Sequence, residues 1–263
     1  MLGLLSRPAS PGTGPAPRAL VAAPSPARDR RSRWRRRAAV LVCLIVGLAA
    51  GLVFANAALP SVADAPRRVG LIDARHGTRA AAVCACSRLA RAVVAVEDER
   101  FYSHGAIDPW SLARVIKGSV FGSVDPGGST ISQQLAKVLY VRDPSSLLGR
   151  LKAIGLAAKL ERRYGKDTIL RMYLNAVYYG HGFYGAAAAS RGYFGRRVSA
   201  LSWSQASLLA GLPQAPTAYD PMRHLTLARE RQREVLAQLV DNGVLPRVQA
   251  RAVLKAPLHL RRS

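Results

Sequence analysis

The chain has 263 residues, of which 49% are hydrophobic, with 22 glycines and 16 prolines. This composition excludes collagen-like and wholly disordered proteins. Lysine and arginine number 39 against 15 aspartates and glutamates, a formal net charge of +24, which predicts an anionic partner: nucleic acid, an anionic membrane face or a phosphorylated substrate. Cys43, Cys84 and Cys86 are too few for a disulfide framework, and we expect a bridge between Cys84 and Cys86 to be badly strained.

Residues 1–37 are expected to form a disordered, basic cytoplasmic tail. Proline, alanine, glycine and serine dominate this segment, and it ends in the arginine-rich run 28–37. It holds too little apolar surface to offset the entropy lost on ordering.

An apolar stretch over residues 38–59 predicts a transmembrane anchor. A helix of this length reaches roughly 33 Å, enough to cross a hydrocarbon core of about 30 Å. Arginines directly before it predict a single pass with the N-terminus in the cytoplasm. The alternative is a cleaved signal peptide with its site at 55–57. We expect no nucleic-acid partner, because the remaining basic residues then lie on the far side of the membrane.

Residues 60–68 are expected to be a linker, and residues 69–263 a mostly α-helical domain large enough for a substantial core. Asp167 and Ser202 are the expected N-caps of two of its helices. No useful strand alternation and no repeat occurs. Apolar periodicity predicts helices over 89–96, 147–164, 167–179, 202–212, 227–239 and 246–255.

Three acids, Glu97, Asp98 and Glu99, follow the first of these helices, and His104 comes soon after. If Glu97 faces a cleft lined by the apolar side of the helix, desolvation raises its pKa, as a general base near neutral pH requires. A solvated helix end is the commoner alternative for such a cluster.

A second segment, 127–137, has two glycines that are expected to open a helix. Ser129 and Thr130 would occupy its first turn, and Gln133, Gln134 and Lys137 the next turns. Free amides, hydroxyls and a lysine suit phosphate or pyrophosphate oxygens. The glycine spacing is not that of a Walker loop, and a simply capped helix is equally compatible.

Together the two segments resemble the first two motifs of the peptidoglycan glycosyltransferases, in the form Glu97-Asp98-x-x-Phe101-x-x-His104 and Gly128-Ser129-Thr130-Ile131-Ser132-Gln133-Gln134-Leu135-x-Lys137. That family includes the monofunctional transglycosylases and the polymerase domain of class A penicillin-binding proteins. The resemblance spans about residues 69 to 257, and it continues through 160–175, which ends in Asn175, and through 208–221.

The resemblance implies an all-α, lysozyme-like, two-lobed domain with a membrane-embedded jaw. Such enzymes polymerise lipid II on the outer face of the bacterial cytoplasmic membrane. The 4-hydroxyl of the acceptor sugar attacks the anomeric carbon of the growing chain and expels undecaprenyl pyrophosphate, with inversion to a β-1,4 link. The implied partners are therefore lipid II, the growing glycan chain, the membrane and other cell-wall synthesis proteins.

The resemblance also implies roles for individual residues. Glu97 matches the base, and a divalent cation, Mg or Mn, is expected to assist at the pyrophosphate, with its ligands unassigned. A poor sugar nucleophile needs such a base, whereas a pyrophosphate leaving group needs cations rather than an acid. The expected substrate- and pyrophosphate-binding residues are Lys137, Arg114, Ser129, Thr130, Gln133, Gln134, Lys152 and Arg142, and the expected supporting residues are Asp98, Phe101, His104 and Asn175.

The chain departs from the family in its third motif, where an Arg-Lys-x-x-Glu run falls on 149–153 and its glutamate position is Ala153. Many members of the family have a phosphate-binding arginine at the position that is Ser145 in this chain. Arg142 could take the place of that arginine. At two further positions where the family usually has a glutamate, this chain has Arg171 and Gln205.

We expect a membrane-anchored, monofunctional-type glycosyltransferase, and two alternatives stay open. One is a lipid-II-binding or scaffold relative without turnover, motivated by Ala153. The other is a lysozyme-like hydrolase, which needs a second carboxylate; Glu161 is the nearby spare one.

Overall fold

The computed structural model describes residues 43, 57–78, 82–110 and 128–261. The chain divides into two units, Met1–Ala55 and Asn56–Ser263. Only Cys43 of the first unit is described, so the fold below is that of the second unit.

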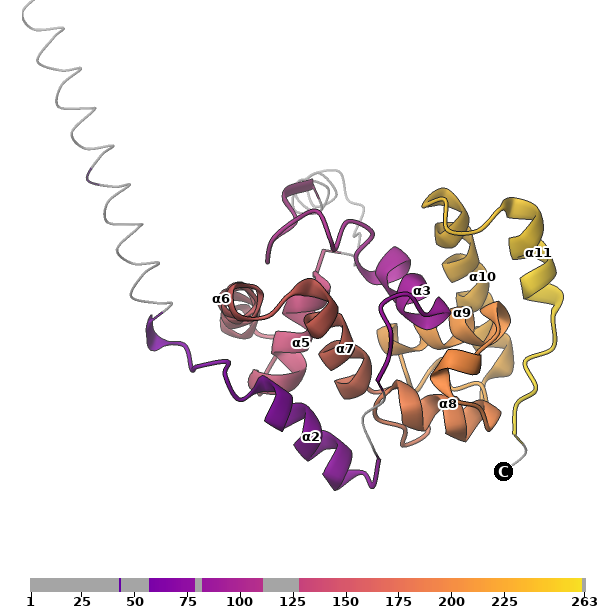
Figure 1. Ribbon diagram of the computed structural model, residues 1–263, viewed down its shortest axis with the longest axis horizontal. Helices are drawn as coiled ribbons and strands as arrows, with labels where there is room; N and C mark the ends of the chain where they lie inside the picture. The colour runs from indigo at the N-terminus through magenta and orange to yellow at the C-terminus, as the bar shows by residue number, and fades with distance from the viewer. Residues whose placement is uncertain (1–42, 44–56, 79–81, 111–127, 262–263) are drawn as a thin grey trace, which may run out of the picture. The chain divides into compact units, whose positions relative to one another are not determined.

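In its described residues the second unit is all-helical, with nine α-helices and two short 3-10 helices (Figure 1). The one β-like feature there is an isolated antiparallel bridge between Tyr178 and Tyr184. The elements are α2 (Ala65–Arg75), α3 (Arg88–Glu97), α5 (Ile131–Tyr140), α6 (Leu147–Arg163), α7 (Lys166–Ala176), α8 (Ala186–Phe194), η1 (Val198–Ala200), α9 (Trp203–Gly211), η2 (Leu212–Gln214), α10 (Leu225–Asp241) and α11 (Arg247–Lys255).

The mostly α-helical fold class is confirmed, and each of the six predicted helices exists, with ends shifted by up to three residues. The Ser202 hydroxyl caps α9 as expected, in a capping box with Gln205. Helices α2 and α8 were not predicted. Helix α8 opens on a run of four alanines, which offers little contrast between apolar and polar positions.

Two details of the predicted helix starts are wrong. Helix α7 is capped by Gly165 rather than Asp167, whose carboxylate accepts a hydrogen bond from the Tyr102 hydroxyl at 2.9 Å. Helix α5 begins at Ile131, because Thr130 has extended backbone and its hydroxyl accepts the Gln133 N–H as an N-cap. Ser129 and Thr130 therefore precede the helix instead of forming its first turn.

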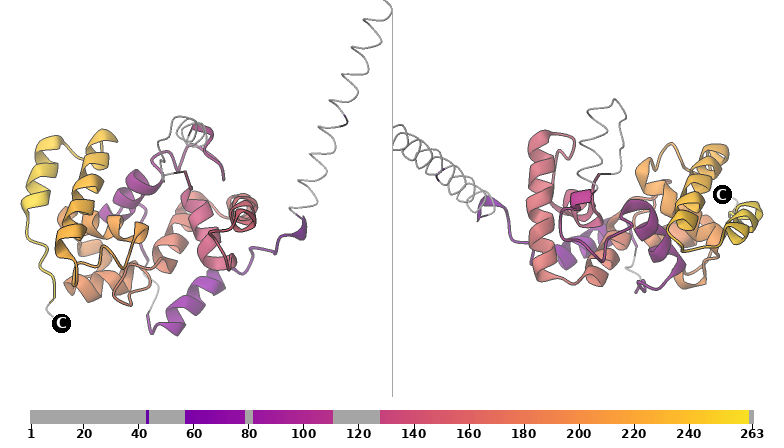
Figure 2. Two further views of the ribbon diagram at one scale, coloured as in Figure 1. Left: turned by 180° about the vertical axis from the view of Figure 1, so that it is seen from behind. Right: turned by 90° about the horizontal axis from the view of Figure 1, so that it is seen from above.

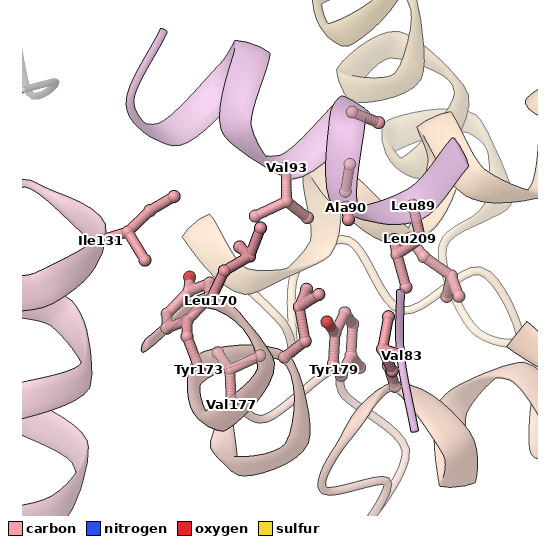
Figure 3. Close-up of a cluster of buried hydrophobic side chains, with 14 of the residues drawn as sticks. Val83, Leu89, Ala90, Val93, Ile131, Leu170, Tyr173, Val177, Tyr179 and Leu209 are labelled. Atoms are coloured by element: carbon pink, nitrogen blue, oxygen red, sulfur yellow. The ribbon is translucent and has the colours of Figure 1, made fainter. Parts of the chain in front are cut away.

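The helices pack in two groups that share a core. Helix α5 contacts α2, α6 and α7 in one group, and α3, α9, α10 and α11 form the other group. The two views of Figure 2 place α6 and the α10–α11 hairpin at opposite ends of this unit. Figure 3 shows the shared core, where Val93 of α3 lies near Leu170 and Tyr173 of α7. This packing brings the C-terminal end of α3 to the junction of the two groups.

Cys84 and Cys86 form a disulfide, although only one residue separates them. The Ser87 N–H donates to the Cys84 carbonyl in a turn, and the two cysteine Cα atoms lie 5.1 Å apart, an ordinary separation for a disulfide.

Among the described residues, no helix has both the length and the apolar character needed to cross a membrane. The predicted anchor, 38–59, lies outside these residues except for Cys43 and 57–59, and the predicted tail, 1–37, lies wholly outside them.

Candidate active site

Glu97 is the last residue of α3, and its carboxylate is partly buried at the junction of the two helix groups. Burial is the main cause that raises its pKa above the ordinary value of 4.5, and the negative charge of Asp98 adds to the rise. A hydrogen bond from Gln134 and the positive charge of Arg231 act in the opposite direction. The net effect is a carboxylate that binds a proton more strongly than an exposed glutamate does.

Gln134 of α5 orients this carboxylate. Its side-chain N–H donates to Glu97 Oε2 at 2.6 Å, and its oxygen accepts from the Tyr173 hydroxyl at 2.9 Å. The amide faces this way because an ionised carboxylate can only accept hydrogen bonds. Oε1 of Glu97 has no hydrogen-bond partner in the described part of the chain, so it is the oxygen that can receive a proton.

Two buried tyrosines surround this group, Tyr173 and Tyr179, and Figure 3 shows both rings in the apolar core. Burial, together with the negative charge of Glu97, raises both pKa values, so both hydroxyls stay neutral. The Tyr179 hydroxyl is buried without a hydrogen-bond partner among the residues described. The Glu97 carboxylate thus lies in a largely apolar environment, with one neutral hydrogen-bond donor and no salt bridge among the described residues.

Asp98, the next residue, ties the end of α3 to the start of α5. One of its oxygens pairs with His104 Nε2 at 2.6 Å, and the other accepts the backbone N–H of Ile131 at 3.0 Å. Both side chains of the pair are buried. The two residues therefore occupy supporting positions, one on each side of the turn that follows α3.

Polar side chains at the start of α5 bind the loop that follows α3 rather than leaving an open anion site. The Thr130 hydroxyl and the Gln133 amide both donate to the Ala106 carbonyl, at 3.2 and 2.7 Å. Ser129 instead accepts a hydrogen bond from Lys137 Nζ at 2.9 Å. Of the predicted pyrophosphate ligands on this segment, Ser129 and Lys137 are brought together, while Thr130 and Gln133 are occupied by backbone.

Lys137 is half-buried and lies about one turn after Gln134 on the same side of α5. Burial is the larger cause that lowers its pKa from the ordinary 10.5, and repulsion by the positive charge of Arg150 adds to it. Lys137 on α5 and Arg150 on α6 therefore form a region of positive potential. Lys152 and Arg142 are exposed on and just before α6, and Arg114 lies outside the described residues.

Glu161, the carboxylate considered for a hydrolase, is bound by other side chains of the domain. It accepts hydrogen bonds from the Ser132 hydroxyl and from Lys166 Nζ, the latter at 2.9 Å. Lys166 in turn lies 4.5 Å from the ring centroid of Phe101, which is fully buried. Phe101 is thus a core residue that supports this cluster.

Two of the positions that were predicted to depart from the family, Ala153 and Gln205, are buried parts of the fold. Ala153 is 1% exposed and packs in the hydrophobic core on the buried face of α6. Gln205 donates its side-chain N–H to the Leu258 carbonyl at 2.9 Å, a bond that an ionised glutamate could not make. The predicted supporting residue Asn175 is buried, and its amide donates to the Arg171 carbonyl at 2.9 Å within α7.

Arg231 is a site residue that the sequence reasoning missed. It is 9% exposed, its charge lowers the pKa of Glu97, and it pairs with Glu234 at 2.7 Å. Ala228 and Val235 lie three residues before it and four after it on the buried face of α10. Helical periodicity thus puts this arginine on the apolar face of α10. An arginine at such a position is usually buried and paired, and this is the sequence signal that could have identified it.

No group of three or more His, Cys, Asp or Glu in the described segments could hold a metal ion.

The transglycosylase family matches residues 73–240 of the chain. Penicillin-binding protein 1A of Neisseria flavescens is 40% identical over 172 residues, which cover 65% of this chain and 22% of that protein. Penicillin-binding protein 1F of Bacillus subtilis is 42% identical over 155 residues, or 59% of this chain and 22% of the relative. The chain thus matches about a fifth of the length of these curated relatives. A crystal structure of penicillin-binding protein 1A from Haemophilus influenzae aligns with 38% of this chain and 15% of that one, at 34% identity and a TM-score of 0.36.

Proposed function

Because the chain belongs to the transglycosylase family, we propose that it is a peptidoglycan glycosyltransferase that polymerises lipid II into glycan strands. The observation that carries this proposal is the state of Glu97. Its pKa is raised by burial, Gln134 holds one oxygen, and the other oxygen has no partner among the described side chains. A carboxylate in this state suits the removal of a proton from a weak nucleophile near neutral pH.

In the proposed reaction, the 4-hydroxyl of the acceptor sugar loses its proton to Glu97 Oε1 as its oxygen attacks the anomeric carbon of the growing chain. The bond from that carbon to the lipid pyrophosphate breaks, and attack from the opposite side gives a β-1,4 link. The pyrophosphate departs as an anion and needs no proton. Lys137, which Ser129 orients, and Arg150 would stabilise its developing charge.

Exposed apolar residues support a membrane-bound domain. Leu147, Leu148 and Leu151 at the start of α6 are all more than half exposed, and Arg150 and Lys152 are exposed beside them. Leucines next to cations suit the boundary of an anionic lipid surface. We place the protein at the bacterial cytoplasmic membrane, as a single-pass protein with its N-terminus in the cytoplasm and its catalytic domain outside. The two helix groups support a two-lobed, lysozyme-like arrangement of that domain.

A divalent cation, Mg or Mn, stays a prediction. The described residues offer it no cluster of protein ligands, and Ala153 replaces the family glutamate that could assist. Its charge would neutralise the pyrophosphate when bound, and the steps above rely on the lysine and arginine instead.

A second candidate function is favoured by Ala153. A relative that has lost the second glutamate could bind lipid II, or act as a scaffold for other cell-wall synthesis proteins, without turnover. The hydrolase alternative has less support, because Asp98 and Glu161 are both bound by other groups of the fold.

The experiment is an assay of full-length protein in detergent with labelled lipid II. Wild type should form polymer and Glu97→Gln should not, whereas Glu99→Gln, an exposed neighbour, is the matched control and should polymerise normally. Retained but unpolymerised lipid II with wild type would support the binder, and shortening of preformed glycan would support the hydrolase. Release of the protein from membranes by carbonate washing would contradict the anchor.

A further inference from the structure

A cavity of about 340 Å³ lies beside the N-terminal end of α3, away from the candidate active site. Its size is within the range of about 300–1,000 Å³ that is usual for small-molecule sites. Glu97 lies at the other end of this ten-residue helix, roughly 15 Å away. The polar and sulfur-bearing lining comes from Cys84, Ser87, Arg191, Arg197 and Ser199.

The charged lining of the cavity is entirely positive. Arg191 follows the middle of α8 and Arg197 precedes η1, and neither guanidinium has an ion-pair or hydrogen-bond partner among the described residues. No aspartate or glutamate lines the cavity. Two unpaired arginines at one cavity favour an anionic ligand, since each guanidinium can donate two parallel hydrogen bonds to a carboxylate or phosphate.

The disulfide supplies a reactive group at the same place. Cys84 lines the cavity, and both Cys84 and Cys86 are exposed. Exposed disulfides belong to the reducible class, whereas buried ones resist exchange. Cys86 directly precedes Ser87, the N-cap of α3, so a thiolate released there lies at the positive end of the helix dipole.

We propose that Cys84 and Cys86 form a thiol–disulfide exchange site for a small thiol that carries an anionic group, with Arg191 and Arg197 binding that group. The thiolate of the ligand attacks Cys84 Sγ, the S–S bond breaks, and Cys86 leaves as a thiolate. A second ligand thiolate then attacks the ligand sulfur of the mixed disulfide and releases Cys84. In total, two ligand thiols are oxidised to one disulfide, and the protein disulfide takes up two electrons and two protons.

The experiment measures how fast the disulfide of the full-length protein is reduced by mercaptosuccinate, which carries two carboxylates, and by neutral 2-mercaptoethanol. Each rate is divided by the rate for the oxidised peptide 82–88, which corrects for the intrinsic reactivity of each thiol. Alkylation and mass spectrometry report Cys84 and Cys86 separately. We expect the corrected rate to be about tenfold higher for mercaptosuccinate, and the preference to weaken with salt.

Variants separate binding of the anion from general reactivity. Arg191→Gln/Arg197→Gln should lose the preference, and Arg191→Lys/Arg197→Lys should keep most of it. Arg233→Gln/Arg247→Gln, which removes the same charge at a different cavity, should keep it fully. Equal corrected rates for the two thiols, a preference that survives in the glutamine variant, or free Cys84 and Cys86 thiols in the isolated protein would each overturn the proposal. None of these readouts depends on lipid II.

Discussion

The side-chain amide of Gln134 donates a hydrogen bond of 2.6 Å to Glu97 across the contact between α5 and α3. Because the donor is neutral, it orients the carboxylate and stabilises its charge less than a salt bridge would. The Tyr173 hydroxyl holds the amide from behind. Glu97 therefore keeps a raised pKa and a fixed orientation together, which is the combination that a general base needs.

The first prediction concerns the pH dependence of polymerisation. Glu97 must be ionised to accept a proton, so kcat/KM should fall as the pH drops through its raised pKa, at a pH above 4.5. Gln134→Ala removes a donor that lowers this pKa, so the acidic limb should move to higher pH and kcat should fall. Rates with labelled lipid II over a pH series test this, with Gln249→Ala as the exposed control. An unmoved limb would contradict the assigned role of Gln134.

The second prediction concerns stability. Between pH 4.5 and the raised pKa, the unfolded chain loses the Glu97 proton while the folded chain keeps it. The contribution of this group to the free energy of unfolding therefore falls as the pH rises through that window, and stays low above it. In Glu97→Gln the side chain cannot ionise, so the free energy of unfolding does not fall for this reason. The free energy of unfolding of the variant, relative to that of wild type, should therefore be higher at pH 7 than at pH 4. The two proteins should differ by no more than about 1 kcal/mol at either pH.

Denaturant unfolding of both proteins at the two pH values measures this difference, and the comparison at pH 4 is the internal control. A variant that loses stability relative to wild type as the pH rises would show that Glu97 is stabilised in its charged form, against the burial argument.

The three consecutive acids show how far the sequence could predict the site. Apolar periodicity predicts α3 and places Glu97, Asp98 and Glu99 at its end, because helix formation depends on local spacing. The three side chains then differ: Glu97 is partly buried, Asp98 binds His104 and α5, and Glu99 is exposed. Their environments depend on how α5 packs against α3, a contact between residues far apart in sequence.

The same limit applies elsewhere. The motif predicts the same substrate-binding role for Gln133 and Gln134. The packing shows that Gln133 donates to a backbone carbonyl, whereas Gln134 donates to Glu97. Arg231 approaches from α10, more than a hundred residues after Glu97 in the sequence. Helical periodicity predicts most of the helices, and tertiary contacts decide which polar side chains are left for chemistry.

The third prediction concerns Lys137. Its amino group is half-buried, hydrogen-bonded to Ser129 and close to the charge of Arg150. Lys137→Ala should weaken transition-state stabilisation by roughly 2–4 kcal/mol, the scale of one lost electrostatic donor. Steady-state kinetics should show this loss in kcat. Lys255→Ala, at an exposed position of α11, is the control. A change in KM alone would indicate that the lysine binds substrate and transition state equally.

The fourth prediction concerns Ala153, at the position where the resemblance to the family predicts a glutamate. Its side chain is 1% exposed on the buried face of α6, and α6 packs on α5, which carries Lys137. We expect the site to be active in its present form, with Lys137 and Arg150 neutralising the leaving group. Ala153→Glu should then lower stability by about 1–3 kcal/mol through overpacking, and leave turnover unchanged or reduced. Ala153→Gln, which has similar volume and no charge, is the matched control.

Comparison of the two variants separates the remaining possibilities. If the chain is a slow enzyme that lost the support of a carboxylate, Ala153→Glu should raise turnover and sharpen the dependence on a divalent cation, while Ala153→Gln should do neither. A carboxylate near Lys137 would also raise the pKa of that lysine, which burial and Arg150 now lower. If the chain only binds lipid II, wild type and both variants should retain the substrate and form no polymer. That last result would overturn the proposed enzyme function, because Glu97 would then not act as a base in polymerisation.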